Sequence, residues 1–332
     1  MSPKNRNIEK QRVAIDDITI HKETIKPGEN ALVRINVGKL PSGTKININA
    51  HVFNGLKPGP TVLVLGGVHG DEINGVEIIR SILADEHFEK INAGTIVAIP
   101  IVNIYGFINF SRAVPDGKDV NRSFPGSMNG SLASRVARVI SSKILPHVDY
   151  IIDLHTGGAS RYNYPQIRYT GTDEKAFELA KAFGAPFILK KPVITRSLRK
   201  IARDKKVPII IYEGGESLRF DGHAIFTGVN GILRVLNHLE MLECDTSDPD
   251  RLLHFGKTTW VRAPRSGLFM WTKKSGSRIQ QDEIIGVVND PQGLSTVSVM
   301  APKDGYIIGH NNASVVNQGD ALFHISTEYE RL

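Results

Sequence analysis

The chain has 332 residues, of which 41% are hydrophobic, and its formal net charge is +7. This length and apolar content support one large domain plus a small one, and no segment approaches the ~20 apolar residues that a membrane span needs. The first residues carry charges without an apolar run behind them, so we expect no secretory signal. One cysteine, Cys244, excludes an internal disulfide. These features favour a cytoplasmic enzyme with no membrane partner.

The excess of basic residues does not indicate a nucleic-acid partner. Pairs such as Lys190-Lys191, Lys205-Lys206 and Lys273-Lys274 are scattered along the chain, and no aromatic residues are interleaved with them. We therefore expect a solvated surface, or a field that draws anionic substrates toward a cleft. Homo-oligomer formation stays open.

The order of the expected elements indicates an α/β fold. Residues 10–58 have the pattern of short strands, including 31–37 and 45–52. From residue 61 onward apolar strands alternate with helical patterns, which we place at 73–85, 132–145, 173–183, 197–205 and 222–241. Such alternation predicts a mostly parallel mixed sheet that is flanked by helices on both faces.

A histidine and a glutamate lie three residues apart where one buried strand leads into a helix. His69 and Glu72 follow the apolar run 61–65, and His155 follows a second apolar run, 148–154. Open α/β sheets bind their ligands at the carboxyl ends of their strands. Catalytic zinc typically takes three protein ligands and leaves a fourth position for water. Either histidine alone would more often be an ordinary buried residue, but together the three residues predict one zinc ion per chain.

Four motifs along the chain carry a resemblance to a known family. They are Gly-Gly-x-His-Gly-Asp-Glu at 66–72, Asp-x-Asn-Arg-x-Phe-Pro-Gly at 119–126, Asp-Leu-His-Thr-Gly-Gly at 153–158 and Tyr-Glu-Gly-Gly at 212–215. In this order they resemble the succinylglutamate desuccinylase/aspartoacylase family, a branch of the zinc carboxypeptidase fold. The resemblance implies a zinc-dependent deacylase that cleaves the amide bond of a small N-acyl amino acid. The motifs are specific for the family and its zinc site, and not for the substrate.

The resemblance also implies a proton carrier. Glu213 follows the apolar run 208–212 and precedes two glycines. A carboxylate in such a place is costly unless it is paired or has a chemical role. By resemblance Glu213 is the general base and acid, which takes a proton from the attacking water and returns it to the leaving amine.

A loop after the apolar run 95–100, which contains the second motif, supplies the other expected site residues. The family pattern places Asn121 and Arg122 on a carboxylate of the substrate, which a guanidinium binds at two points. It places Arg112 near the scissile carbonyl, where a positive group stabilises the developing oxyanion. Asp119 resembles the carboxylate that orients a zinc-bound imidazole from behind.

The last 80 or so residues contain an internal repeat. The polar stretch 245–250 has the composition of a linker, and we place a domain boundary there, with a catalytic domain at 1–250 and a second domain at 251–332. Within the second domain, 261–268 recurs as 299–306, and 279–285 recurs as 316–322. Two copies of one short-stranded unit predict a small all-β domain that closes its edges on itself, and it resembles a barrel-sandwich hybrid domain.

A carrier role for this domain is excluded because a carrier needs a lysine on the hairpin that joins the halves. Between Val288 and Pro302 there is no lysine. A lid or an assembly role is left.

Two other functions compete with the deacylase. A metallocarboxypeptidase that acts on peptides would use the same zinc motif. A non-catalytic small-molecule binding protein would be expected to have lost Glu213 or a ligand residue, and this chain keeps them all. A serine hydrolase is disfavoured because no Gly-x-Ser-x-Gly motif occurs.

Overall fold

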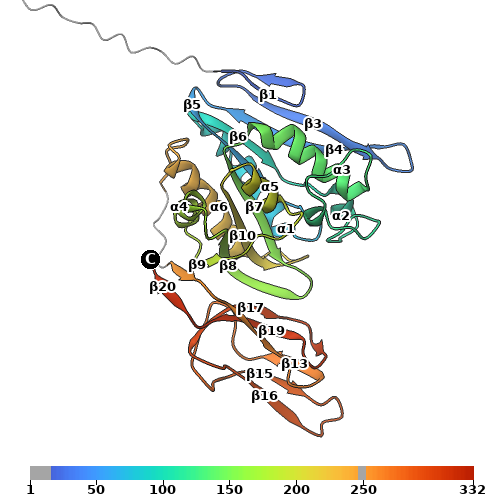
Figure 1. The fold of residues 1–332 in the computed structure, drawn as a ribbon, viewed down its shortest axis with the longest axis vertical. Helices are drawn as coiled ribbons and strands as arrows, with labels where there is room; N and C mark the ends of the chain where they lie inside the picture. Colours follow the sequence, from blue (N-terminus) through green and yellow to red (C-terminus); the bar gives the residue numbers. More distant parts are fainter. Residues whose placement is uncertain (1–15, 246–251) are drawn as a thin grey trace, which may run out of the picture.

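The computed structural model describes residues 16–245 and 252–332, and these form a larger α/β body with a smaller all-β part below it (Figure 1). Part of the expected N-terminal strand region, 10–15, and nearly all of the expected linker lie outside the described residues. The figure colours the N-terminal strands blue and the C-terminal β part orange and red.

A continuous mixed sheet runs through the molecule, and its centre is parallel. The four parallel strands, in spatial order, are β6 (Ala93–Ile99), β5 (Lys57–Leu65), β7 (Tyr150–Gly157) and β10 (Ile209–Glu216). The antiparallel strands beside them are β4 (Lys45–Asn54) and β3 (Asn30–Lys39) at one edge and β8 (Arg161–Tyr169) at the other. The mixed α/β fold is as expected, but the sheet is not mostly parallel. The connection of β7 to β8 spans only 158–160, and a parallel return would need a crossover of a dozen or more residues.

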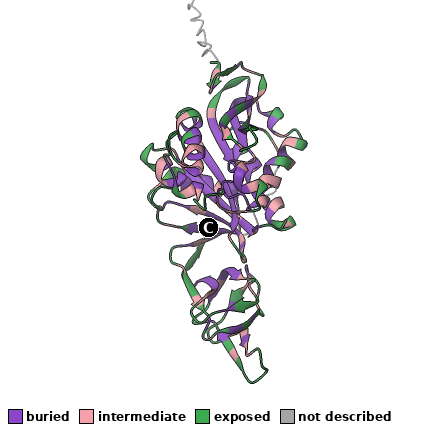
Figure 2. Ribbon diagram, turned by 90° about the vertical axis from the view of Figure 1, so that its right-hand side faces the viewer, coloured by how far each residue is buried: buried purple, intermediate pink, exposed green. Residues whose placement is uncertain are grey.

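Helices cover both faces of the central strands. One face packs against α1 (Ile73–Ala84), α4 (Glu174–Phe183) and α6 (Gly222–His238), and the other against α2 (Ile104–Ile108), α3 (Leu132–Val139) and α5 (Leu198–Asp204). Alternate residues of a strand point to opposite faces. Thus Val62 and Val64 belong to the apolar cluster on the face of α1, α4 and α6, and Leu63 and Leu65 belong to the cluster on the opposite face. The buried strands are visible at the centre of Figure 2.

The expected helices are present with shifted ends. The α4 helix begins after the N-cap Asp173, whose side chain accepts from Ala176 N, and ends at Gly184 with φ 72°. The helix expected over 132–145 is α3 only as far as Val139 and continues as a π turn, Ile140–Ile144, and a 3-10 turn, Leu145–His147. The helix expected at 222–241 ends at His238.

The C-terminal strands repeat their pairing as the sequence repeats. The first four are β12 (Thr259–Arg262), β13 (Gly267–Trp271), β14 (Arg278–Ile279) and β15 (Ile284–Asn289), and the second four are β16 (Thr296–Met300), β17 (Gly305–Asn311), β18 (Val315–Val316) and β19 (Ala321–Ser326). Each strand of the first four corresponds to the strand four places later in the second four. When every strand is replaced by its counterpart, the pairing order β12-β19-β17-β14 becomes β16-β15-β13-β18, which is the order of the second sheet. This is the exchange that a two-fold repeat requires.

The C-terminal strands do not close all their edges on themselves, contrary to expectation. Strand β17 also pairs with β8 through Gly309 and Asn163, so the two parts share one sheet. Strand β11 (Leu253–Phe255) pairs with β9 (Phe187–Lys190) and with β20 (Tyr329–Arg331) at the same edge. An unpaired edge strand can pair with another strand, and here strands of the α/β body provide that pairing. The short hairpin of β1 (Ile18–Ile20) and β2 (Glu23–Ile25) lies at the opposite end of the molecule.

Among residues 16–245 and 252–332, no helix combines the length and the apolar character needed to cross a bilayer.

Candidate functional site

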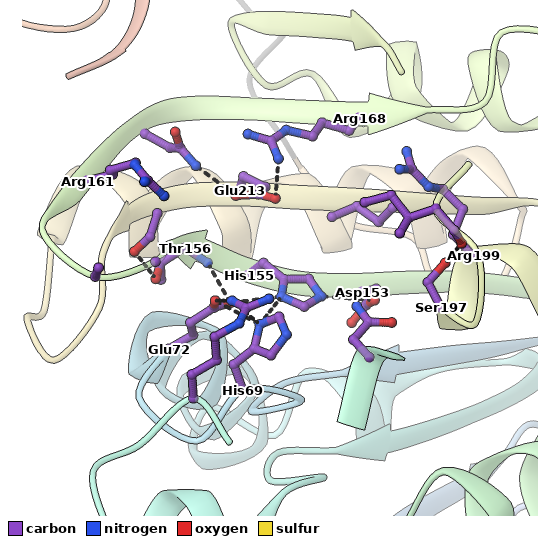
Figure 3. A pocket seen from close by; sticks show the side chains of 18 of the residues that line it. His69, Glu72, Asp153, His155, Thr156, Arg161, Arg168, Ser197, Arg199 and Glu213 are labelled. Atoms are coloured by element: carbon purple, nitrogen blue, oxygen red, sulfur yellow. Dashed lines mark hydrogen bonds and ion pairs between the residues drawn. The ribbon is translucent and has the colours of Figure 1, made fainter. Parts of the chain in front are cut away.

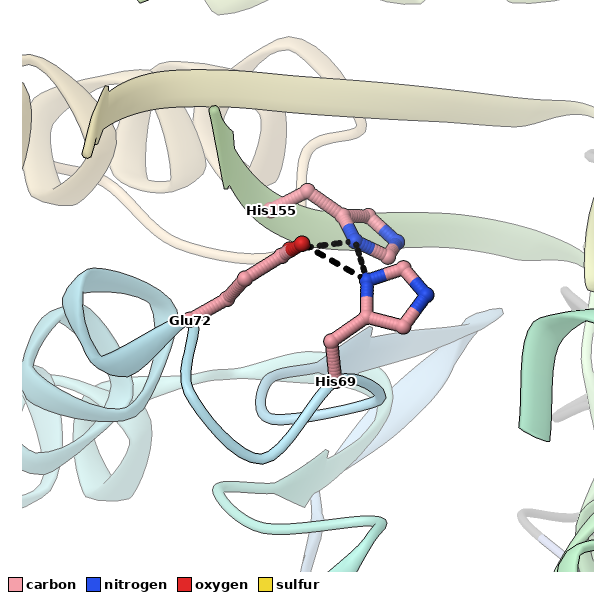
Figure 4. A group of neighbouring side chains, drawn as sticks. All are labelled: His69, Glu72 and His155. Carbon is pink, nitrogen blue, oxygen red and sulfur yellow. Dashed lines mark hydrogen bonds and ion pairs between the residues drawn. The ribbon is translucent and has the colours of Figure 1, made fainter. Parts of the chain in front are cut away.

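His69, Glu72 and His155 meet at the carboxyl ends of β5 and β7 (Figure 4). His69 lies in the turn after β5, Glu72 is the N-cap of α1, and His155 is within β7, which continues to Gly157. Their ligand atoms all lie within 4.8 Å of one another, and all three residues are buried. The sequence prediction that the three residues converge is therefore confirmed.

The two imidazoles present the same ring atom to one carboxylate. His69 Nδ1 lies 2.7 Å from Glu72 Oε1, His155 Nδ1 lies 2.8 Å from Glu72 Oε2, and the two Nδ1 atoms are 3.2 Å apart. The backbone N–H of Thr156 donates to Glu72 Oε2 at 3.1 Å. Two nitrogens and a carboxylate are a donor set typical of catalytic zinc.

Glycines in the first motif allow this convergence. Gly67 has φ 58°, a left-handed conformation that side chains rarely adopt. A Cβ on Gly70 would lie 2.0 Å from the carbonyl carbon of Gly106, so only glycine lets the His69 turn pack against α2. Contact with α2 thus supports the turn on one side, while the side chains of His69 and Glu72 point toward His155.

A carboxylate lies behind each imidazole. Asp119 Oδ1 is 3.3 Å from His69 Nε2, in agreement with the expected position, and Asp153 Oδ2 is 3.0 Å from His155 Nε2. The sequence reasoning missed Asp153. Its signal was available, because residues two apart on a strand share a face, and Asp153 precedes His155 by two. Carboxylates in this place fix the tautomer and orientation of metal-binding histidines.

Burial and charge oppose one another in this cluster. Burial would lower the pKa of His155, but Asp153 and Glu72 raise that pKa well above its ordinary value. Burial would raise the pKa of Glu72, yet His69 and His155 hold it well below its usual range. Likewise burial would raise the pKa of Asp119, but His69 and Arg112 hold it low. The cluster therefore concentrates negative charge that a cation can neutralise, and the residues present fit a zinc ion.

Arg112 connects two of these carboxylates. Its Nη1 lies 3.1 Å from Glu72 Oε1 and 3.1 Å from His69 Nδ1, and its Nη2 donates to Asp119 Oδ2 at 3.0 Å. The Arg112 side chain is 41% exposed, so one side of it faces the cavity beside the cluster.

Glu213 lies within β10, one strand from the cluster. Its Cα is the register partner of His155 on β7, so the two side chains lie on the same face of the sheet. Arg168 Nη1 donates to Glu213 Oε1 at 2.7 Å, and Asn163 Nδ2 donates to Glu213 Oε2 at 2.7 Å. Figure 3 shows Glu213 and Arg168 above His155. Neither Arg168 nor Asn163 was expected from the sequence, because no local motif links β8 to Glu213.

Asn121 and Arg122 lie on a 3-10 turn, Val120–Arg122, and both line the cavity. Asn121 Oδ1 accepts from the backbone N–H of Leu198 at 2.9 Å, so this oxygen ties the turn to α5. Arg122 Nη1 donates to the carbonyl of Asn121 at 2.8 Å. The structure thus brings both residues to the site, with the Asn121 oxygen already occupied.

A cavity of about 390 Å³ opens beside the cluster, and its wall includes residues that the sequence reasoning missed. Arg161 and Arg168 come from β8, Arg199 from α5, and Trp260 from the C-terminal strands. Arg161 lies over the Trp260 ring, 5.9 Å from its centroid. The C-terminal part therefore contributes directly to the wall of this cavity.

Comparison with known proteins identifies the family. The model of the succinylglutamate desuccinylase/aspartoacylase catalytic domain matches residues 58–239, which include the cluster, Glu213 and the 119–126 motif. The chain belongs to this family. The succinylglutamate desuccinylase/aspartoacylase family consists of deacylating hydrolases that act on amide bonds.

Individual known proteins match most of the chain. The N-alpha-acetyl-L-2,4-diaminobutyric acid deacetylase of Halomonas elongata is 28% identical over 290 residues, 82% of this chain and 84% of that protein. A family structure from Rhodobacter sphaeroides is 26% identical with a TM-score of 0.81, and it covers 96% of this chain and 99% of its own. The product-bound ectoine utilization protein EutE (DoeB) of Ruegeria pomeroyi shares the fold, with a TM-score of 0.80 at 21% identity over 90% of this chain and 95% of its own. Coverage of this extent shows that the C-terminal strands belong to the shared architecture.

Proposed function

We propose that this chain is a zinc-dependent hydrolase that cleaves the amide bond of a small N-acyl amino acid. The observation that carries the proposal is the convergence of His69, Glu72 and His155 beside an arginine-lined cavity of about 390 Å³. Membership of a family of deacylating hydrolases supports the same reaction.

His69 Nδ1, Glu72 and His155 Nδ1 would hold one zinc ion per chain. When bound there, the ion would polarise the amide carbonyl and lower the pKa of a water to about 7. Asp119 and Asp153 fix the two imidazoles by facing their Nε2 atoms.

Glu213 carries the proton in this proposal. It accepts a proton from the attacking water and delivers that proton to the leaving amine. Arg168 and Asn163 each donate a hydrogen bond to one carboxylate oxygen, so Glu213 keeps its position during the reaction. We treat Arg168 and Asn163 as positioning residues.

Two arginines take separate roles toward the substrate. Arg112 stabilises the negative charge that develops on the carbonyl oxygen, since its exposed side faces the cavity beside Glu72. Arg122 binds a carboxylate of the substrate, and the Asn121 amide group that is not tied to Leu198 donates beside it.

We propose a catalytic part at 1–250 and a barrel-sandwich-hybrid part at 251–332 that borders the cavity through Trp260. A wall on that side favours small substrates over peptide C-termini, the substrates of the competing carboxypeptidase function. In this proposal the C-terminal part is a fixed border of the cavity and carries no prosthetic group on a lysine.

A turnover screen tests the proposal. Zinc-loaded protein should hydrolyse at least one of a set of N-acetyl, N-succinyl and N-formyl amino acids, with release of a free amine. The same preparation should leave C-terminally blocked and unblocked peptides intact. Hydrolysis of peptides alone would replace the proposal by the carboxypeptidase function.

A further inference from the structure

Asn163 holds the proposed proton carrier, and the amide of Asn163 can do so in one orientation only. Its Nδ2 donates to Glu213 Oε2 at 2.7 Å, and the residue is 7% exposed. A carboxylate only accepts hydrogen bonds, so the amide nitrogen must face Glu213 and the amide oxygen must face away from it. The groups around that oxygen therefore decide whether the nitrogen reaches the carboxylate.

The strand that carries Asn163 is irregular directly after this residue. In the pairing of β8 with β10, two residues of β8 face one residue of β10 between the pairs Gln166–Glu213 and Asn163–Gly215. In a regular strand, residues an odd number apart point to opposite faces, and an extra residue reverses that alternation. Asn163 and Arg168 are five residues apart, and both bind Glu213.

Before the irregularity, β8 lies against the C-terminal part. Residues 161–163 pair at every position with residues 309–311 of β17, whereas the pairing with β10 ends at Asn163. The ring of Tyr162 stacks on the ring of His310 with the centroids 5.2 Å apart. Figure 1 shows β17 beside β8 where the two parts meet. The strand β17 therefore fixes the position of the segment that carries Asn163.

Gly309 is the residue of β17 that lies opposite Asn163. A Cβ on Gly309 would lie 2.8 Å from Asn163 Oδ1 and 2.9 Å from the carbonyl oxygen of Tyr162. Packed Cβ atoms essentially never come within 3.0 Å of another heavy atom. The backbone of Tyr162 is held in the sheet, so the Asn163 amide is the group that a side chain at 309 would displace. Glycine leaves the amide oxygen its place.

We infer that Gly309 of the C-terminal part is a positioning residue for the proton carrier and that it acts through Asn163. The inference rests on the proposed function and gives the C-terminal part a role in the chemical step, beyond its contribution to the cavity wall. The absence of a side chain at Gly309 lets Asn163 Oδ1 lie against β17, and this directs Nδ2 at Glu213. The docking of the two parts thereby sets the position of Glu213.

Gly309→Ala tests the inference on the zinc-loaded full chain with a substrate that the wild type accepts. We expect kcat to fall by at least roughly 10-fold, the scale of a hydrogen bond to a charged group, while KM changes little. Zinc content should stay at the wild-type level, because neither Gly309 nor Asn163 is a proposed ligand. Gly256→Ala is the matched control, because a Cβ at Gly256 meets nothing within 4 Å. An unchanged kcat in Gly309→Ala would overturn the inference.

A double-mutant cycle separates action through Asn163 from a general loss of docking. Asn163→Ala removes the amide that the new Cβ would displace, and should itself lower kcat by a similar factor. In the Asn163→Ala background, Gly309→Ala should then lower kcat hardly further. Equal losses of kcat in both backgrounds would show that Gly309 acts through the Tyr162 backbone, and would overturn the inference.

The same pair of variants covers a failure to fold. If Gly309→Ala is unfolded by thermal denaturation and the double variant is folded, the clash lies at Asn163 and the inference is supported. If the double variant is unfolded as well, the clash lies with the backbone and the inference is overturned.

Crystal structures separate this inference from the proposed function, because they require no turnover. Gly309→Ala should lose the contact between Asn163 Nδ2 and Glu213 Oε2 that the wild type makes, with β17 still paired to β8. That result supports the positioning role even if no N-acyl amino acid is hydrolysed and the deacylase function fails. Hydrolysis of N-acyl amino acids, together with an intact contact in Gly309→Ala, would overturn the positioning role and leave the deacylase function standing.

Discussion

Glu213 and His155 are register partners in the parallel pairing of β10 with β7. Directly paired residues of neighbouring strands lie on the same face of a sheet, about 5 Å apart. The proposed proton carrier and a proposed metal ligand are thus placed side by side by backbone hydrogen bonds. Their separation does not depend on a flexible loop, which suits a site that must hold a water between them.

We expect Glu213→Gln to keep bound zinc while turnover falls by at least ~10²-fold, the usual scale for loss of a general acid–base group. The amide preserves the hydrogen bond from one partner but cannot accept a proton. Zinc content by elemental analysis and turnover of an accepted substrate check both parts. Glu216→Gln is the control, because Glu216 ends the same strand outside the cavity lining. Normal turnover in Glu213→Gln would give Glu213 another role.

A second prediction concerns the metal. His69→Ala and His155→Ala should each strip most of the zinc from protein purified without added metal, because each removes one of the three proposed ligands. Asp153→Asn should weaken zinc affinity by about 10- to 100-fold, because it releases the imidazole that Asp153 orients. His147→Ala, at an exposed histidine, should leave the metal content unchanged. Full occupancy in both ligand variants would refute the assignment.

Arg122 should act on the α-carboxylate of the substrate. Amidation of that carboxylate should reduce kcat/KM of the wild type strongly, and should reduce that of Arg122→Ala hardly further, because the partner is already gone. The double-mutant cycle of protein and substrate isolates this pair. Additive losses would show that Arg122 contacts something else.

Trp260 should set the size of substrate that the cavity accepts. Replacement of its ring by Ala opens the wall that the C-terminal strands contribute, so Trp260→Ala should accept bulkier acyl groups than the wild type. Trp271→Ala is the matched control, because Trp271 belongs to the same β part but does not line the cavity. Relative kcat/KM values over a series of acyl chain lengths measure the effect. An unchanged series in a folded Trp260→Ala protein would limit the β part to assembly or stability.

Two buried histidines should make the C-terminal part sensitive to acid. Burial lowers the pKa of His310 to about 4 and that of His324 well below its ordinary value. A histidine with a depressed folded pKa binds more protons when unfolded, so its stabilising effect is present above pH ~6.5 and is lost as the pH falls toward the folded pKa. For His310 the loss between pH 7 and pH 5 is on the order of 2 kcal/mol.

Tryptophan fluorescence can follow this acid effect, because both tryptophans of the chain contact these histidines. Trp260 stacks on His324 with ring centroids 4.7 Å apart, and Trp271 lies 4.7 Å from His310. Urea unfolding at pH 7 and pH 5 should show the loss of stability, and His310→Gln should reduce the difference. Equal stability at both pH values would mean that the imidazoles can be protonated in the folded protein.

The sequence determined the proposed zinc-binding set and the helical framework. His69 and Glu72 are separated by one turn of chain, and His155 ends an apolar run, so local pattern alone was enough to group them. The ends of α4 followed from Asp173 and Gly184, whose capping preferences are intrinsic to those residue types. Signals of this kind depend on residues that are close in the sequence, so they can be recognised without knowledge of the fold.

Only the tertiary structure decided what surrounds Glu213 and where the cavity ends. Asn163 and Arg168 reach Glu213 because β8 pairs with β10 in one register, and Trp260 reaches the cavity because β17 docks on β8. Arg199 lines the cavity because α5 packs against the sheet. Register and docking arise from hydrogen bonds between segments far apart in the chain. No periodicity or spacing in the sequence records which strands will meet, so these partners appear only in the folded protein.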